Sequence, residues 1–471
     1  MGRSLPSLTK TEKTTSHNLN LMTNNKSNKL WSSADAVDKQ VETFTIGNDA
    51  DFDLHLAPFD VAGSMAHTIM LGESDLLSSD DVEKLLRELT AIFEKIQSEE
   101  FEIEEGIEDV HSQVEILLTR KLGDTGKRIH TARSRNDQVL VDLKLFLRNE
   151  IEDIADHVIK LVNLLSSKAE EFKKIGLPGY THMQAAMPST FGIWFSAYAE
   201  ALLDDLELGT GIRQYINKNP LGSAAGYGSS FPINRTRTTE LLEFDDLHVN
   251  VVNAQFSRGK TERQMAWFLA TIAQTMNKLA SDVCQYVSQN FGFMKLDPLF
   301  TTGSSIMPHK KNPDVFELIR GRTNVIQALP QELTLLLTNL PSGYHREFQL
   351  TKEHLFPAIE SLKETLTIAH LALQKLAIRE DLLDEERYDT LFTVERVHEL
   401  VREGVPFRDA YKKVAEEVDE GTFKRPENLK HSHEGSAGNL QLDKLQARAE
   451  KLEQDYGFIS VKELVIKLSG V

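Results

Sequence analysis

The hydrophobic positions of the chain recur at helical spacing over most of its length. Between residues 80 and 96, one apolar stripe advances in steps of three and four and consists of Val82, Leu85, Leu86, Leu89, Ile92, Phe93 and Ile96. Such spacing places these side chains on one face of an α-helix. Alternation with a period of two, which is typical of strands, is scarce. The pattern therefore predicts an all-α protein from about Phe44 onward.

Five of the predicted helices are unusually long. The stripe over residues 137–172 continues without proline or glycine, and at ~1.5 Å per residue this helix would be on the order of 50 Å long. Similar segments cover residues 189–217, 261–291, 314–338 and 353–377, and Pro330 is expected to kink the fourth. Five such rods predict an elongated bundle, and their lateral apolar stripes favour a homo-oligomer.

Composition narrows the class of protein. The chain has 471 residues, of which 40% are hydrophobic and 26% charged, as in ordinary soluble globular proteins. Because no run of 18 apolar residues occurs, we expect no membrane span. A net charge of −18 disfavours nucleic-acid binding. The single cysteine, Cys284, cannot form an internal disulfide, which fits the cytoplasm, and no His/Cys cluster has zinc spacing.

The first 30 residues differ from the rest. They hold five Lys/Arg and one Glu, are rich in Ser, Thr and Asn, and lack the apolar segment of a secretory signal. A transit peptide would be richer in arginine. Residues 1–29 are therefore expected to be a disordered tail or the product of an upstream start, with Met22 as the true initiator.

Polar segments between the helices carry the candidate chemistry. The stretch Glu108–Glu115 leads to "HTARSRNDQV" (residues 130–139), where Arg133 and Arg135 stand just before a long helix. Guanidinium groups and helix N-terminal amides both favour carboxylates. Alternatively, Asn136 or Asp137 simply caps the helix and both arginines are solvated.

Two further segments lie between long helices. In residues 177–190, Thr181 and His182 stand between a Pro-Gly turn and a Pro-Ser-Thr helix start. Histidine exchanges protons near neutral pH, although a lone histidine is more often structural. Residues 219–235 contain several glycines, but no strand precedes them, so a dinucleotide-binding loop is rejected and a structural turn is expected.

The stretch "GSSIMPHKKNPD" (residues 303–314) divides into two parts. Its end predicts a helix start, with Asn312 as N-cap and Pro313 in the first turn. Its beginning resembles a mobile flap that carries Ser304 beside the positive charge of Lys310. A positive field beside a hydroxyl base favours removal of a proton α to a carboxylate, because the carbanion delocalises into that carboxylate.

Taken together, "SRNDQV", "GYTHMQ" and "GSSIMPHKKNPD" resemble the fumarase/aspartase superfamily and, within it, the argininosuccinate lyase family. The similarity runs from about Leu30 to the C-terminus. It implies an all-α fold with an elongated central bundle of five long helices, flanked by two smaller, mostly helical domains. We expect an N-terminal domain over residues 30–131, the bundle over 132–385 and a C-terminal domain over 386–471.

The resemblance also implies an activity. A carbon–nitrogen lyase of this family performs an anti β-elimination on 2-(Nω-L-arginino)succinate and releases fumarate and L-arginine, the last step of arginine biosynthesis. It needs no metal or organic cofactor. Its expected partners are the small-molecule substrate and other copies of the chain, since three subunits complete each site of a homotetramer.

Site residues follow by position in the motifs. The resemblance implies that Ser304 removes the Cβ proton of the succinyl moiety, and that His182, hydrogen-bonded to Glu317, belongs to the proton-donating side. Whether His182 acts directly, through water or only by orienting its neighbours stays open. Implied contacts to the carboxylates of the fumarate part come from Asn136, Thr181, Lys310 and Asn312, with Ser134 and Arg135 nearby. The implied contacts to the arginine end come from Tyr344, Gln349 and Lys352. His111 matches a further site histidine, and Arg263 matches an arginine that lines the site.

Some positions depart from the family pattern. The family's N-terminal substrate-binding serine has no clear counterpart, and Thr45, Gly47, Asn48 and Asp49 compete for its place. Thr351 stands where an acidic residue is common. Two alternatives stay open: another fumarate-releasing lyase of the adenylosuccinate lyase or aspartase type, and an inactive structural relative. The second is disfavoured because Ser304 and His182 are both present.

Overall fold

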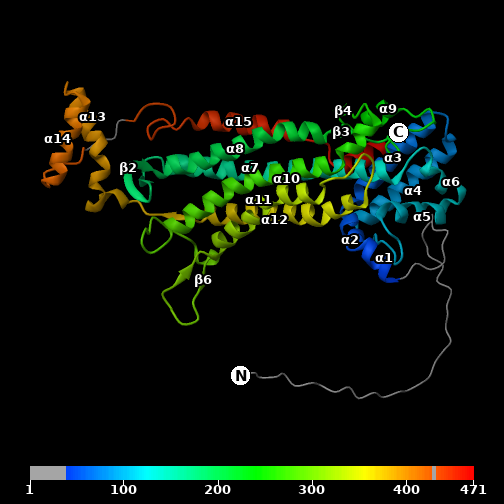
Figure 1. Cartoon of the computed structure of the whole chain (residues 1–471), viewed down its shortest axis with the longest axis horizontal. Helices are drawn as coiled ribbons and strands as arrows, with labels where there is room; N and C mark the ends of the chain where they lie inside the picture. The colour runs from blue at the N-terminus through cyan, green and yellow to red at the C-terminus, as the bar shows by residue number, and fades with distance from the viewer. Residues whose placement is uncertain (1–38, 427–430, 471) are drawn as a thin grey trace, which may run out of the picture.

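A computed structural model describes residues 39–426 and 431–470 of the chain, and the predicted tail at residues 1–29 lies outside them. The described part is an elongated, almost wholly helical molecule, which confirms the predicted fold class (Figure 1). Within these residues, no helix combines the length and apolar character needed to cross a bilayer.

Five long helices run side by side through the middle of the molecule, as predicted (Figure 1). They are α7 (Arg135–Glu171), α8 (Phe191–Ile216), α10 (Val251–Tyr286), α11 (Asp314–Leu336) and α12 (Thr351–Gln374). The stripe that predicts α7 is buried, since Leu147, Ile154, Leu161 and Leu165 are all fully inaccessible. The apolar periodicity therefore identified the faces that pack together.

A break in helical geometry lies in α10, where the sequence predicted none, and the kink expected at Pro330 stays a prediction. α11 continues as one helix through Pro330. In α10, by contrast, Arg258 has ψ of 136° and Gly259 has φ of 74°, both outside the helical region. A positive φ suits glycine, which has no Cβ to clash with the backbone. The helix predicted to start at residue 261 is thus the segment after this kink.

Smaller helices gather at one end of the bundle (Figure 1). They are α1 (Lys39–Ile46), α2 (Asp49–Asp53), α3 (Ala57–Glu73), α4 (Ser79–Gln97), α5 (Val110–Leu122), α6 (Asp124–Lys127) and α9 (Arg235–Leu241). Short 3₁₀ helices span Leu54–Leu56, Arg128–His130, Pro298–Phe300, Arg346–Leu350 (η4), Leu382–Asp384 and Glu386–Phe392. α3 packs against both α4 and α7, so the end helices share the core of the bundle.

The C-terminal segment extends along the whole molecule. α13 (Thr393–Arg402) and α14 (Phe407–Asp419) lie at the far end around a small core of their own (Figure 1). α15 (Leu442–Tyr456) returns along α7 and α8, and α16 (Val461–Ser469) packs against α3 and α4. The predicted domain boundaries stay a prediction, and residues 386–471 contribute to both ends.

Four pairs of short strands interrupt the helices in the described residues. β1 (Gly176–Thr181) and β2 (Gln184–Thr190) form an antiparallel hairpin, as do the two-residue strands β6 (Thr302–Gly303) and β7 (Lys311–Asn312). β5 (Met294–Lys295) pairs antiparallel with β8 (Ala377–Ile378), and β3 (Lys218–Asn219) pairs parallel with β4 (Asp246–Leu247).

The β6–β7 pairing corrects one prediction. α11 begins at Asp314 with Pro313 in the N-cap position and without a side-chain cap, so Asn312 is not the N-cap. Asn312 instead lies in β7, where its Nδ2 donates to Thr302 Oγ1 at 3.4 Å. Because Asn312 is paired with Thr302 in the strand and the helix begins only at Asp314, Pro313 takes the N-cap position.

Candidate active site

One polar pocket lies at the end of the bundle that carries the small helices. Its walls come from α2, the start of α5, the first turns of α7, the kink of α10, and the segment that leads through η4 into α12. The lining residues are Asp49, Asp53, Glu108, Asp109, His111, Arg135, Asn136, Val139, Arg258, Tyr344, Arg346, Gln349 and Lys352. Six of these are predicted site residues, namely His111, Arg135, Asn136, Tyr344, Gln349 and Lys352.

The first turn of α7 is fixed by a capping box. Ser134 is the N-cap: its Oγ accepts from the backbone N–H of Asn136 at 3.3 Å, and its own N–H donates to Asp137 Oδ1 at 2.9 Å. Neither Asn136 nor Asp137 is therefore the N-cap, so the alternative interpretation of this segment as a simple Asn or Asp cap is wrong. The cap leaves Arg135 and Asn136 to line the pocket and gives Ser134 a structural role, while its substrate contact stays a prediction.

The glycine-rich turn supports the same helix start. Asp137 is fully buried, and its Oδ2 accepts the backbone N–H groups of Gly222 and Ala224, each at 2.9 Å. Gly222 has φ of 83°, which favours glycine. The turn expected between two helices is confirmed, and it holds the N-terminus of α7 in place.

Arg135 and Arg346 are paired with two adjacent carboxylates. Arg135 Nη1 lies 2.6 Å from Asp109 Oδ2, and Arg346 Nη2 lies 2.6 Å from Glu108 Oε1. Burial alone would raise the pKa of Asp109, but the charges of His111 and Arg135 outweigh it and lower this pKa. The two carboxylates therefore fix the positions of the guanidinium groups.

Lys352 is buried between two aspartates. Its Nζ lies 2.7 Å from Asp49 Oδ1 and is also paired with Asp53, and the lysine side chain is only 3% exposed. Burial raises the pKa of Asp49 to about 6, against the opposing charge of Lys352 and with some help from Asp53. Of the four candidates for the N-terminal contact, Asp49 is thus the one whose side chain lines the pocket.

Other pocket contacts involve the backbone near Asp49. Gln349 Nε2 donates to the carbonyls of Thr45 and Ile46, at 3.2 and 2.8 Å. Tyr344 is 41% exposed at the pocket's edge. Thr351, at the position where an acidic residue was expected, is buried and donates to Phe348 O at 2.7 Å. Two carboxylates of α2, Asp49 and Asp53, therefore neutralise Lys352, and no acidic side chain at position 351 is needed for this.

Arg258, not Arg263, is the arginine of α10 that lines the pocket. Its Nη2 donates to Phe348 O at 3.0 Å, and its Nε lies 2.8 Å from Glu262 Oε1. The helical kink at Arg258 and Gly259 turns this side chain toward η4. Helical periodicity gives no sign of such a kink, and the glycine after Arg258 was the available signal.

The remaining predicted site residues lie elsewhere in the chain. Thr181 and His182 are exposed at the tip of the β1–β2 hairpin, and His182 has a φ of 52°. Ser304 and Lys310 belong to the segment between β6 and β7, in which Ser304 Oγ accepts the N–H of Met307 at 3.1 Å. Both hairpins lie toward the end of the bundle opposite α1 and α2 (Figure 1). One chain therefore does not bring them to the pocket.

Glu317 lies in the first turn of α11, exposed and 4.0 Å from Arg320. The described part of the chain contains no hydrogen bond between Glu317 and His182, so that implied contact stays a prediction. Its formation would require the hairpin and α11 to come from different copies of the chain or to change position.

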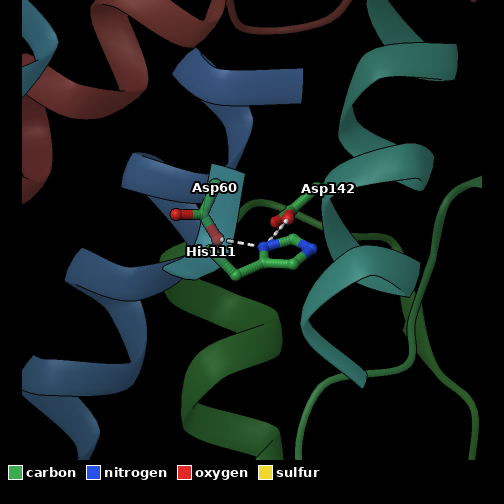
Figure 2. A group of neighbouring side chains, drawn as sticks. All are labelled: Asp60, His111 and Asp142. Carbon is green, nitrogen blue, oxygen red and sulfur yellow. Dashed lines mark hydrogen bonds and ion pairs between the residues drawn. The ribbon is translucent and has the colours of Figure 1, made fainter. Parts of the chain in front are cut away.

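His111 is held from behind by two buried carboxyl groups. It is the second residue of α5, and its Nδ1 lies 2.9 Å from Asp60 Oδ1 and 3.4 Å from Asp142 Oδ2 (Figure 2). Asp60 comes from α3 and Asp142 from α7. These two aspartates were not among the predicted residues, because only the packing of three helices brings them to His111.

The pocket as a whole contains four acidic side chains (Asp49, Asp53, Glu108 and Asp109) and four basic ones (Arg135, Arg258, Arg346 and Lys352). Such a site can bind a ligand that carries both carboxylates and cationic groups, since each cation and each carboxylate can exchange an internal partner for the ligand.

Known proteins resemble this chain over most of its length. A family model described as Lyase matches residues 32–328. Argininosuccinate lyase of Bacteroides thetaiotaomicron is 52% identical over 94% of this chain and 99% of its own length, and that of Thermotoga neapolitana is 37% identical over 83% of this chain and 98% of its own.

Solved structures show the same fold. An EDDS lyase variant with bound fumarate superposes with a TM-score of 0.72 at 21% identity, covering 90% of this chain and 93% of that one. A fumarate lyase:delta crystallin from Brucella melitensis has a TM-score of 0.69 at 17% identity, covering 88% and 94%. From the sequence identity and the extent of the match, the chain belongs to the argininosuccinate lyase family of the fumarase/aspartase superfamily.

Proposed function

We propose that the protein is a carbon–nitrogen lyase that cleaves 2-(Nω-L-arginino)succinate to fumarate and L-arginine, the last step of arginine biosynthesis. The observation that carries this proposal is the pocket, in which six residues expected to bind substrate meet from three separate segments of the sequence. Its balanced charges suit the arginine end of the substrate, which is a zwitterion with an additional guanidinium group. The high identity to named argininosuccinate lyases supports the same substrate over adenylosuccinate or aspartate.

The proposed chemistry is an anti β-elimination. Ser304 accepts the Cβ proton of the succinyl moiety, and the electron pair delocalises into the adjacent carboxylate, which Lys310 and Asn312 stabilise. The C–N bond then breaks, and the guanidino nitrogen leaves with a proton from the side of the site that holds His182 and Glu317. Thr181, Arg135 and Asn136 hold carboxylates, while Tyr344, Gln349 and Lys352 hold the arginine end. No metal or organic cofactor is assigned a step, because the carboxylate itself acidifies the carbon.

We also propose a homotetramer in which different subunits complete each site. Two observations support it. The hairpins that carry His182 and Ser304 lie toward the end of the bundle opposite α2, which lines the pocket (Figure 1). In addition, α8, α10 and α11 expose large apolar side chains, Leu208, Trp267, Leu318, Val325 and Leu335, each more than half accessible. Antiparallel packing of these faces would bring opposite ends of two bundles together. The cytoplasmic location stays a prediction.

The test is a continuous absorbance assay for fumarate with argininosuccinate as substrate. The wild type is expected to turn over, and Ser304→Ala to lose about 10²–10⁴-fold in kcat, the range for removing a general base. Ser305→Ala is the matched control, since it removes the same hydroxyl one residue away and is expected to keep its rate.

Three results would contradict parts of the proposal. Unchanged turnover in Ser304→Ala would remove Ser304 as the base. A His182→Asn variant with full rate would remove His182 from proton transfer. Activity on adenylosuccinate or aspartate with none on argininosuccinate would establish the alternative lyase.

A further inference from the structure

His111 and two aspartates form a buried group of ionisable side chains in the wall of the pocket. The elimination chemistry assigns no role to this group. Asp60, His111 and Asp142 are 0–5% exposed and come from three helices, α3, α5 and α7. His111 Nδ1 is directed at both carboxyl groups (Figure 2). Asp60 Oδ1 also accepts from Gln138 Nε2 at 2.9 Å.

The geometry fixes the tautomer of His111. Both groups that face Nδ1 are carboxyl oxygens, so Nδ1 carries a hydrogen and donates it to Asp60. His111 also lines the pocket, and with Nδ1 held by the aspartates, Nε2 is the ring nitrogen that can face a ligand. The aspartates therefore determine how this histidine is presented to a ligand.

The two carboxyl groups cannot both be ionised at low cost. Within the described residues, neither oxygen of Asp142 accepts a hydrogen bond, because the Nδ1–H of His111, 3.4 Å from Asp142 Oδ2, is donated to Asp60; Asp142 is also fully inaccessible. The space around it is tight, since a Cβ on Gly63 would lie 3.3 Å from Asp142 Oδ1. A buried carboxylate without donors takes up a proton instead of staying charged. The resulting O–H can donate to the neighbouring Asp60, which removes the unsatisfied group.

Surrounding charges favour the same assignment. Burial, followed by the negative charge of Asp60, raises the pKa of Asp142 well above its ordinary value. For Asp60, burial is outweighed by the hydrogen bond and charge of His111 and by Arg133, so its pKa is lowered. Burial likewise opposes the charge on His111, but Asp60, with Asp109 and Asp53 beyond it, raises the His111 pKa.

We propose that Asp60 and Asp142 share one proton and act as positioning residues, with Asp60 ionised and Asp142 protonated, so that His111 presents a charged N–H to an anionic group of the substrate. This role rests on the function proposed above, because the anionic group is a carboxylate of that substrate. His111 would thus contribute to binding as a fixed donor, and its charge would depend on Asp60 more than on Asp142.

The proton on Asp142 is tested first, by infrared spectroscopy of the substrate-free protein. At pH 8.5, the wild type is expected to show a carboxylic-acid C=O band that disappears in Asp142→Asn. Asp205→Asn is the matched control: it makes the same change in a buried carboxyl group on α8 that accepts from Thr275 at 2.6 Å. The control is expected to keep the band. A wild type without the band, or a band that survives in Asp142→Asn, would overturn the proposal.

Steady-state kinetics test the charge on His111. Asp60→Asn is expected to lower kcat/KM at pH 7 by about tenfold to a hundredfold, the range for losing a hydrogen bond to a charged group, mostly through KM. Part of the loss should be recovered at lower pH, because His111 is then protonated without Asp60. An equal loss at every pH, or none, would contradict the proposed role and leave a purely structural one.

A metal ion is the competing explanation, since the three ligand atoms lie within 4.8 Å of one another. If Zn²⁺ or Mn²⁺ raises the melting temperature of chelator-treated wild type but not of Asp142→Asn, the group is a metal site and the proposal fails. The infrared measurement needs no substrate. It therefore still decides the proton-sharing pair if argininosuccinate turns out not to be cleaved.

Discussion

Lys352 shows how single residues prepare the pocket. Its ammonium group is almost completely buried, which is tolerated because Asp49 and Asp53 surround it. Arg135, Arg346 and Arg258 are paired in the same way. A zwitterionic substrate bound in this pocket would therefore replace internal ion pairs, and each replacement would restore the charge balance of a group that lines the pocket. Selectivity against uncharged analogues follows, because they would leave these groups unpaired.

His67 links single-residue chemistry to stability. It is fully buried on α3, and its ring nitrogen Nε2 lies 2.9 Å from the carbonyl of Thr131, just before the capped start of α7. Burial, assisted by Arg133, lowers the pKa of His67 to about 3 from 6.5. The folded protein thus binds fewer protons than the unfolded chain, so this contribution is complete above pH 6.5 and is lost as the pH falls toward 3.

We predict that, through His67 alone, the free energy of unfolding falls by about 2 kcal/mol as the pH is lowered from 6.5 to 5. The decrease follows from 1.36 kcal/mol per pH unit for a group that the unfolded chain protonates and the folded protein does not. His67→Gln, which keeps a donor for Thr131 but cannot titrate, should remove that part of the pH dependence. Urea unfolding at pH 7.5 and 5 measures the difference. The same substitution at the exposed His309 is the control. Identical pH dependence in wild type and His67→Gln would contradict the prediction.

At the scale of the element, the start of α7 and the kink of α10 position most of the pocket. The Ser134–Asp137 capping box and the backbone donors of the glycine-rich turn hold the start of α7 in place. The kink of α10 turns Arg258 toward η4. Each feature ends or interrupts a helix, where backbone groups and side chains are free to face a ligand.

The kink predicts a clear effect of Gly259→Ala. An alanine at φ of 74° is strained, and its Cβ would lie 2.7 Å from Leu337 Cδ1 and 2.9 Å from Phe348 Cε1. We expect a loss of about 1–3 kcal/mol in unfolding free energy and a raised KM, because Arg258 and η4 must shift. Thermal unfolding and kinetics measure both effects.

Gly211→Ala is the matched control for the kink. Gly211 lies on α8, and no atom of the described residues comes within 4 Å of an added Cβ, so the same substitution should stabilise the protein by up to about 1 kcal/mol. If both variants behaved alike, the backbone conformation at Gly259 would not be what positions this wall of the pocket.

At the scale of the whole molecule, the distance between the pocket and the two hairpins is the main fact. It leads to a complementation experiment with two inactive variants, Asn136→Ala in the pocket and Ser304→Ala in the β6–β7 segment. If a site takes these two residues from different subunits, mixed oligomers regain up to about a quarter of wild-type activity, since each residue is intact in half of the subunits. Fumarate release after joint refolding measures it.

The control for complementation mixes Ser304→Ala with Asn312→Ala. Every subunit then carries one defect in its β6–β7 segment, so no site receives a segment with both residues intact. Activity should stay at the level of the separate variants. Failure of the first mixture to exceed its parents would argue that each site is complete within one chain.

The sequence by itself determined the helical class, the five long rods and the motifs, because apolar periodicity and short polar segments are local properties. It also predicted a site role for Arg135, Asn136 and Lys352, which line the pocket. Only the tertiary structure decided which groups lie behind them. Asp60 and Asp142 meet His111 because three helices pack there, Arg258 reaches the pocket where α10 is kinked, and Asn312 is held in a strand instead of capping α11. Each of these depends on contacts between distant segments, which no local pattern in the chain records.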